Sequence, residues 1–115
     1  MSKRTPRLLL EDIQESAEKI LEYTKDLTFE EFSIDNKTID AVIRNFEIIG
    51  EASNLLPDEI KDKYPEIDWH RIRGFRNRVV HDYFGVDLQI VWKITFDQIP
   101  GLISEIVKII RHFQR

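Results

Sequence analysis

Apolar residues recur at helical spacing along most of this chain, and this recurrence limits the possible fold more than any other feature. Between residues 7 and 26, Ile13, Ala17 and Ile20 fall on one face of a helix turning about 100° per residue. Between Asp35 and Pro57 the same period covers a longer run, namely Ile39, Val42, Ile43, Phe46, Ile49, Gly50 and Ser53. Only four Pro and four Gly occur in 115 residues, too few for a β fold with many turns. The sequence therefore predicts an all-α protein.

Capping and breaking residues set the limits of the expected helices. Asp35, Asp68 and Asp87 suit N-cap positions, and Gly85 suits the end of the helix that starts after Asp68. We expect long helices over residues 7–26, 35–56, 68–85 and from 87 onward, a short helix over 57–64 and a connector over 28–32. Pro100-Gly101 should kink or break the last helix. The expected architecture is an up-and-down helical bundle of four long helices plus one short helix, in a single domain spanning residues 1–115.

The composition excludes several kinds of site. No cysteine is present, so disulfides and thiolate zinc sites are absent, and His70, His81 and His112 lack the spacing of metal ligands. The three leucines at 8–10 are too short a run for a signal-peptide core, and no apolar run approaches the ~18 residues of a membrane span. We therefore expect a cytoplasmic protein with no metal, no cofactor and no membrane contact.

The net charge of −4 conceals an asymmetry along the chain. Residues 1–68 hold 9 Lys and Arg against 17 Asp and Glu, whereas residues 69–115 hold 8 against 4. The resulting balances of −8 and +4 add up to the net charge of −4. A polyanion would be repelled by the first part and attracted by the second, unless the basic run is simply a solvated helix face.

The basic part is centred on residues 76–84, where two arginines, an amide, a histidine and a tyrosine stand close together. Four arginines and no acid occur between Arg71 and His81. On a helix, one face carries Ile72, Phe75, Val79 and Tyr83. Arg76 points into the same apolar arc, where a guanidinium must be paired or must line a cleft. Glu47 and Glu51, which border the apolar face of the preceding long helix, could receive Arg76 or Arg73 as a partly buried ion pair, or could hold a catalytic arginine in position.

The residue types of this stretch suit the cleavage of a phosphodiester bond. The imidazole of His81 titrates at about pH 6.5 and can both take and give a proton at neutral pH. Arg76 offers a planar fork of donors to phosphate oxygens and can stabilise the charge of a pentacovalent state. The nucleophile would be the 2′-hydroxyl of RNA, so DNA should not be cut. Asn77 can orient His81 or the RNA, and Arg73 and Arg78 can guide the RNA strand electrostatically.

The string Arg-Asn-Arg-Val-Val-His-Asp-Tyr-Phe at residues 76–84 resembles the Arg-x4-His-x-Tyr signature of the HepT-like toxins, which are minimal HEPN-domain ribonucleases. Ile-Ile-Gly-Glu-Ala at 48–52, Leu-Pro-Asp-Glu-Ile at 56–60 and Pro-Glu-Ile-Asp-Trp at 65–69 also match, so the resemblance runs from roughly residue 7 to the C-terminus. It implies a HEPN-like bundle and a metal-independent endoribonuclease toxin. It also implies a homodimer whose cleft carries both copies of the motif, with Arg76 and His81 as the catalytic residues.

The resemblance further implies a regulatory partner. In a type VII HEPN/MNT toxin–antitoxin pair, the antitoxin is a minimal nucleotidyltransferase, similar to enzymes that transfer AMP, and the tyrosine of the motif is the acceptor. By position the acceptor is Tyr83. An AMP group there would add bulk and negative charge beside His81 and Arg76, which would block the cleft and repel RNA phosphates.

Two other interpretations stay open. The protein could be a non-enzymatic subunit that binds a nucleotide, or a scaffold for a nucleotidyltransferase, in which Arg76 contacts phosphate only. Alternatively, it could be a helical dimer in which Arg76 and His81 have a structural role. An RNA cleavage assay on His81→Ala separates the ribonuclease from both.

The remaining prominent residues have structural explanations. Trp69 and Trp92 have apolar neighbours and are expected to anchor the core or a subunit interface rather than to stack on bases. Gly50 costs about 1 kcal/mol of helix propensity against alanine, which indicates the close approach of another helix. His70 and His112 are expected to lie on the surface without a role.

Overall fold

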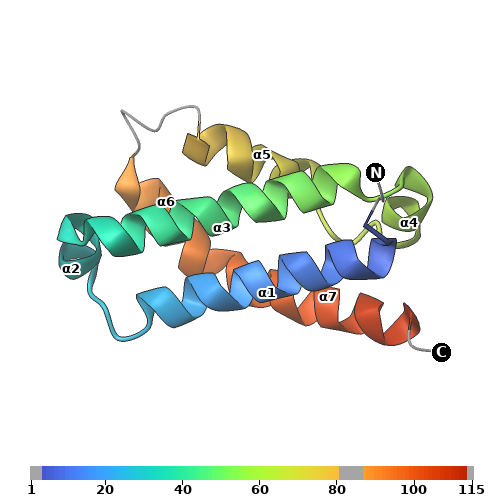
Figure 1. Ribbon diagram of the computed structural model, residues 1–115, viewed down its shortest axis with the longest axis horizontal. Helices are drawn as coiled ribbons and strands as arrows, with labels where there is room; N and C mark the ends of the chain where they lie inside the picture. The colour runs from blue at the N-terminus through green and yellow to red at the C-terminus, as the bar shows by residue number, and fades with distance from the viewer. Residues whose placement is uncertain (1–3, 81–86, 114–115) are drawn as a thin grey trace.

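The computed structural model describes residues 4–80 and 87–113, with the backbone alone described for residues 75–80. Every regular element in these residues is an α-helix (Figure 1), which confirms the all-α prediction. In chain order the helices are α1 (Pro6–Thr24), α2 (Phe29–Ile34), α3 (Asn36–Leu55), α4 (Asp58–Lys63), α5 (Trp69–Val80), α6 (Leu88–Asp97) and α7 (Ile99–Phe113). No helix in this described part has the length and apolar character that a membrane span requires.

The long helices run up and down around α3. Figure 1 shows α1 antiparallel to α3 on one side and α5 antiparallel to it on the other. α7 packs against α1, and the short helices α2 and α4 lie at opposite ends of the molecule (Figure 1). α3 is therefore the central helix, and α5, which carries the arginine-rich stretch, is held mainly by α3.

The hydrophobic core lies between α1, α3 and α7. Its fully buried side chains include Leu10, Ile13, Ile20, Val42, Phe46, Ile49, Ile106 and Ile109. The apolar faces expected for residues 7–26 and 35–56 are the faces that the structure buries. Ile72 of α5 joins the same core, so the apolar face expected for α5 packs inward at this position.

The three expected aspartate caps are confirmed. Asp35 and Asp68 each accept a hydrogen bond from the amide three residues on, at 3.1 and 2.9 Å, and Asp87 accepts one from the amide two residues on, at 2.9 Å. The Thr38 hydroxyl also donates to Asp35, at 2.7 Å, and this bond is the main reason why the pKa of Asp35 is lowered. Local side-chain chemistry therefore fixes where α3, α5 and α6 begin.

The segment expected to be a connector at 28–32 is instead the start of a short helix, α2. Thr28 and Glu31 form a reciprocal capping box. The Thr28 hydroxyl accepts from the Glu31 amide at 3.1 Å, and the Glu31 carboxylate accepts from the Thr28 amide at 2.9 Å. Phe32 is fully buried, and its ring centroid lies 5.1 Å from that of Trp92. The cap and the burial together stabilise a helix that is too short to show a periodic pattern.

The last expected long helix is broken, as Pro100-Gly101 predicted. α6 ends at Asp97 and α7 begins at Ile99, so Pro100 lies in the first turn of α7, where its missing amide hydrogen has no helical partner to lose. The other expected terminator, Gly85, lies outside the described residues.

Aromatic residues tie the outer helices to the core. Trp92 of α6 packs edge-on against Phe29 and Phe96, with ring centroids 6.1 and 4.7 Å apart. The indole nitrogen of Trp69 donates to the Tyr64 carbonyl at 3.2 Å. Both tryptophans are half-buried against the core, so they anchor the core as expected.

The end of α7 is tied to the segment before α5. The Tyr64 hydroxyl lies 2.8 Å from Nδ1 of His112, which was expected to have no role, and the two rings stack. His112 therefore has a structural contact.

Candidate functional site

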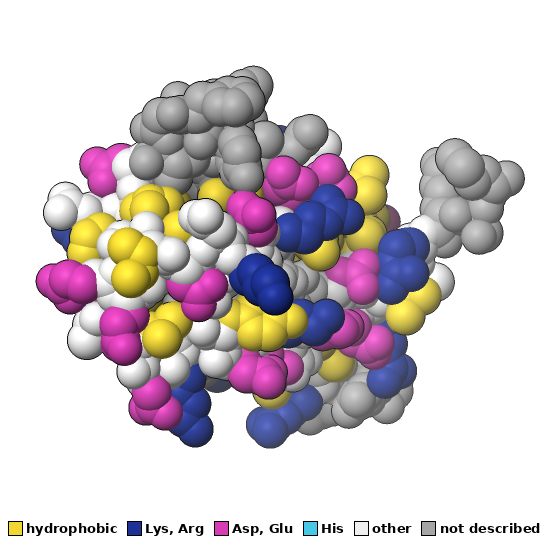
Figure 2. Space-filling view, turned by 60° about the vertical axis from the view of Figure 1, so that its left-hand side comes forward, with side chains coloured by type: hydrophobic (Ala, Val, Ile, Leu, Met, Phe, Trp, Pro, Cys, Tyr) yellow, Lys and Arg dark blue, Asp and Glu magenta, His cyan; other side chains and the backbone are white. Residues whose placement is uncertain are grey.

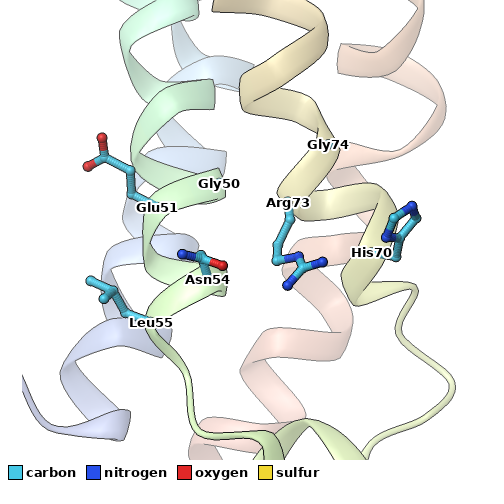
Figure 3. Close-up of a pocket in the computed structure, with 7 residues that line it drawn as sticks. All are labelled: Gly50, Glu51, Asn54, Leu55, His70, Arg73 and Gly74. Carbon is cyan, nitrogen blue, oxygen red and sulfur yellow. The ribbon is translucent and has the colours of Figure 1, made fainter.

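A groove with a cavity volume of about 610 Å³ lies between α3 and α5 (Figure 3). From α3 it is lined by Gly50, Glu51, Asn54 and Leu55. From α5 it is lined by His70, Arg73 and Gly74. The volume falls within the ~300–1,000 Å³ typical of small-ligand sites, and the lining is largely polar. The groove therefore suits a polar or charged ligand.

Arg73 is the cation of this groove. Its side chain is exposed and, in Figure 3, reaches from α5 into the space between the two helices on the side of Asn54. Within the residues that the structure describes it makes no hydrogen bond and no ion pair. By contrast, the guanidinium of Arg71, two residues earlier, lies 3.8 Å from the carboxylate of Asp68. The five N–H donors of Arg73 are therefore available to a ligand.

The α3 wall of the groove presents an amide to this guanidinium. Figure 3 shows the oxygen of the Asn54 amide on the side of α5 and its nitrogen on the opposite side, whereas the carboxylate of Glu51 extends away from Arg73. An amide offers both donors and an acceptor, so Asn54 can bond to a ligand edge that carries both. His70 also lines the groove, and its ring lies on the other side of the α5 ribbon from Asn54 in the view of Figure 3.

Two glycines line the groove. A Cβ atom built on Gly74 would have no neighbour within 4 Å among the described atoms, so no packing contact there requires a glycine. Gly50 is buried and lines the α3 wall of the same groove. Neither position contributes a side chain that would fill the space between the helices.

The predicted catalytic stretch continues from this groove along α5. Arg76, Asn77 and Arg78 lie within the helix, where the structure describes their backbone and not their side chains. Position 76 stands one turn beyond Arg73, on the same side of the helix. His81 lies outside the described residues, as does the predicted acceptor Tyr83.

The two glutamates considered as partners of the arginines have different surroundings. The carboxylate of Glu47 is half-buried and lies 3.1 Å from Nη1 of Arg44, on the same helix. Glu51 lines the groove, although Arg73 pairs with neither carboxylate. Whether either glutamate pairs with Arg76 stays a prediction, since that side chain lies outside the described residues.

Sequence reasoning missed three of the residues that line the groove. Asn54, Leu55 and Gly74 were not singled out, and His70 was expected to have no role. These residues lack a motif or an apolar period that would have marked them, because the groove arises from the packing of α3 against α5. In the described ranges no group of three or more His, Asp or Glu side chains is arranged to hold a metal ion.

The groove and the arginine-rich stretch both fall within a region shared with known proteins. The model of the family described as "Ribonuclease HepT-like" matches residues 13–109. The chain belongs to the HepT-like ribonuclease family. The expected fold class, a HEPN-like helical bundle, is thereby confirmed.

Relatives of this family in archaea and bacteria match over nearly their whole length. "Putative RNase MJ0127" of Methanocaldococcus jannaschii is 40% identical over 114 residues, which cover 99% of this chain and 94% of the relative. "Probable ribonuclease HepT" of Thermococcus cleftensis is 44% identical over 107 residues, which cover 93% and 97%. "Putative RNase TTE0752" of Caldanaerobacter subterraneus is 37% identical over 108 residues, which cover 94% and 96%. No solved structure matches the chain significantly.

Proposed function

We propose that this protein is a metal-independent endoribonuclease that cleaves RNA through its own 2′-hydroxyl. The observation that carries the proposal is the Arg76-x4-His81-x-Tyr83 string, on and just after α5, in a chain of the HepT-like ribonuclease family. The exposed Arg73 and the balance of +4 over residues 69–115 support it, because RNA is a polyanion.

Each residue of the string has a role in this reaction. The 2′-oxygen forms a bond to phosphorus while the bond to the 5′-oxygen breaks, leaving a cyclic phosphate and a 5′-hydroxyl. His81 takes the proton of the 2′-hydroxyl or returns one to the leaving 5′-oxygen. Arg76 binds the phosphate and stabilises the pentacovalent state. Asn77 orients His81 or the RNA, and the positive charge of Arg78 attracts the RNA strand to the site.

Single substitutions test this mechanism. His81→Ala and Arg76→Ala should each abolish RNA cleavage while the circular dichroism spectrum keeps its helical shape, and EDTA should not inhibit the wild type. His112→Ala removes a histidine at the far end of α7 and should leave cleavage intact. Cleavage that survives His81→Ala, or that depends on a divalent ion, contradicts the proposed chemistry.

The proposal includes control by a partner in a type VII toxin–antitoxin pair. A cognate minimal nucleotidyltransferase, supplied with ATP, adds AMP to Tyr83 and thereby stops cleavage: the phenol oxygen loses its proton and bonds to the α-phosphorus of ATP, and pyrophosphate leaves. Peptide mass spectrometry after co-expression should place the modification on Tyr83, and Tyr83→Phe should stay toxic beside the partner. Modification of Tyr23 or Tyr64, or full inhibition without any modification, would contradict this part of the proposal.

We also propose that the active form is a homodimer in which two copies of His81 face a shared cleft, with parts of α5 or of α6 and α7 at the interface. Ile90 and Phe96 of α6 support it, since they are 39% and 48% exposed. Figure 2, which brings the end of the molecule with α2 and α6 forward, shows hydrophobic patches among acidic side chains. A monomer by light scattering at micromolar concentration would count against the dimer.

A second candidate function is a non-enzymatic subunit that binds a nucleotide or acts as a scaffold for a nucleotidyltransferase. The polar groove with its exposed Arg73 favours this candidate, because it could hold a nucleotide without cleaving RNA. Nucleotide binding by a wild-type protein that cleaves no RNA would support it over the ribonuclease.

A further inference from the structure

The groove lies beside the catalytic stretch on a single helix. Positions 76 and 77 lie three and four residues beyond Arg73, so α5 places both on the same side of the helix as Arg73. At a rise of about 1.5 Å per residue, Arg73 stands about 4.5 Å along the helix axis from position 76. If the cleaved phosphate of an RNA strand is bound at position 76, the phosphate of the neighbouring nucleotide can therefore reach Arg73.

Arg73 is equipped to bind that neighbouring phosphate. Its guanidinium is exposed, projects into the groove, and bonds to no other described group. Glu51 is the acid that lines the groove, and Figure 3 shows its carboxylate directed away from Arg73. A free guanidinium binds phosphate in a bidentate manner more readily than one already held by a carboxylate.

Asn54 stands across the groove where a base would lie. In Figure 3 the oxygen of its amide lies on the side of α5, and an asparagine amide, once turned to face a base, pairs with the donor and acceptor of an adenine edge. Single-stranded RNA exposes such edges because its bases can leave the stack. The adjacent Leu55, 65% exposed, offers an apolar contact at the rim, and a cavity of about 610 Å³ has room for one nucleotide.

Gly74 has no packing reason for being a glycine. A glycine within a helix costs about 1 kcal/mol against alanine. Close contact with a neighbour often explains such a glycine, yet a Cβ at Gly74 has no described atom within 4 Å. Since Gly74 lines the groove, its missing side chain keeps the α5 wall open to a ligand.

We propose that the groove between α3 and α5 is a subsite for one RNA nucleotide beside the cleaved bond, in which Arg73 binds the phosphate and Asn54 recognises the base, with adenine preferred. The subsite rests on the proposed ribonuclease function, and it adds a source of sequence preference to that function. Arg73 and Asn54 act as specificity residues here, while the bond is cleaved by the groups farther along the chain.

The test compares Arg73→Ala and Asn54→Ala with matched controls. Arg71→Ala removes an arginine from the same helix that is paired with Asp68, and Asn36→Ala removes an exposed asparagine from the other end of α3. Two measurements are made. The first maps cleavage sites and their kcat and KM in a random-sequence RNA pool. The second measures binding of 2′-O-methyl RNA, which lacks the nucleophile, by fluorescence anisotropy.

The two substitutions should have different effects. Arg73→Ala should raise KM and the dissociation constant about tenfold while kcat stays near the wild-type value, since the lost contact is remote from the cleaved bond. Asn54→Ala should remove the base preference at one position next to the cut, where the wild type favours adenine about tenfold or more. The two control variants should match the wild type.

The outcomes separate the subsite from the catalytic function. If the wild type cleaves RNA and both variants behave like their controls, the subsite is refuted while the ribonuclease stands. If the wild type binds 2′-O-methyl RNA but cleaves nothing, the ribonuclease fails and the anisotropy of Arg73→Ala and Asn54→Ala decides on the subsite alone. Gly74→Glu should weaken binding as Arg73→Ala does, because it puts a carboxylate into the groove.

Discussion

Replacing Gly74 by alanine should raise the stability of the protein, because the added methyl group enters open space. Alanine exceeds glycine in helix propensity by about 1 kcal/mol. A Cβ at this position meets no described atom within 4 Å, so no steric term should offset that gain. The expected change in the free energy of unfolding is therefore about +1 kcal/mol.

The corresponding shift in melting temperature follows from the length of the chain. Unfolding entropy amounts to about 2.1 cal/mol/K per residue, or about 0.24 kcal/mol/K for 115 residues. A gain of about 1 kcal/mol should then raise Tm by about 4 °C. Circular dichroism melts and urea titrations at one pH and salt concentration measure both quantities.

Gly101 provides a matched control for Gly74. It is also a helical glycine with no described atom within 4 Å of an added Cβ, and it lies in the first turn of α7. Gly101→Ala should stabilise by a smaller amount, since propensity counts less near a helix end. If Gly74→Ala lowers Tm while Gly101→Ala raises it, the α5 wall is occupied and the open groove described above is wrong.

Two further predictions concern α2 and α3. Asp35→Ala should destabilise the protein at neutral pH, and the difference from wild type should shrink in acid. The hydrogen bond from Thr38 keeps the pKa of Asp35 low in the folded protein. The stability that Asp35 contributes is therefore present above the pKa of this carboxyl in the unfolded chain, and it is lost as the pH falls through the lowered pKa of the folded protein. A series of urea titrations toward about pH 3 follows this loss. Phe32→Ala should cost about 3–5 kcal/mol, because the ring is fully buried against Trp92. Phe113→Ala, at a 37% exposed site, should cost less than about 1 kcal/mol, and equal losses at both sites would refute the assignment of Phe32 to the core.

The parts of the fold that could be predicted from sequence depend on neighbours along the chain. An aspartate that accepts from an amide two or three residues on, as Asp35, Asp68 and Asp87 do, is visible in the sequence itself. The helix α2 was also marked, by Thr28 and Glu31 at capping-box spacing, but six residues were too few to show an apolar period. That helix was missed because its stability comes from Phe32 reaching Trp92, a contact between distant parts of the chain.

The groove could not be predicted for a related reason. Asn54 and Arg73 stand on different helices, and both are exposed, so neither takes part in the apolar pattern that marks a helix face. Their meeting depends on how α3 packs against α5, which periodicity leaves undetermined. The roles of Arg76, His81 and Tyr83 came from a motif together with the chemistry of its side chains, and they stay predictions.

The position of α3 between two helices has a consequence for how the protein tolerates change. At about 100° per residue, the buried residues of α1 span an arc of about 120°, whereas those of α3 span about 180°. α3 is thus enclosed over half its circumference, and even Asn45 and Ala52, which share one edge of its apolar face, are buried. Random substitutions should be neutral at fewer positions along α3 than along α1. Substitutions that accumulate by drift, attached labels and substitutions made for solubility are therefore better accommodated on the outer face of α1.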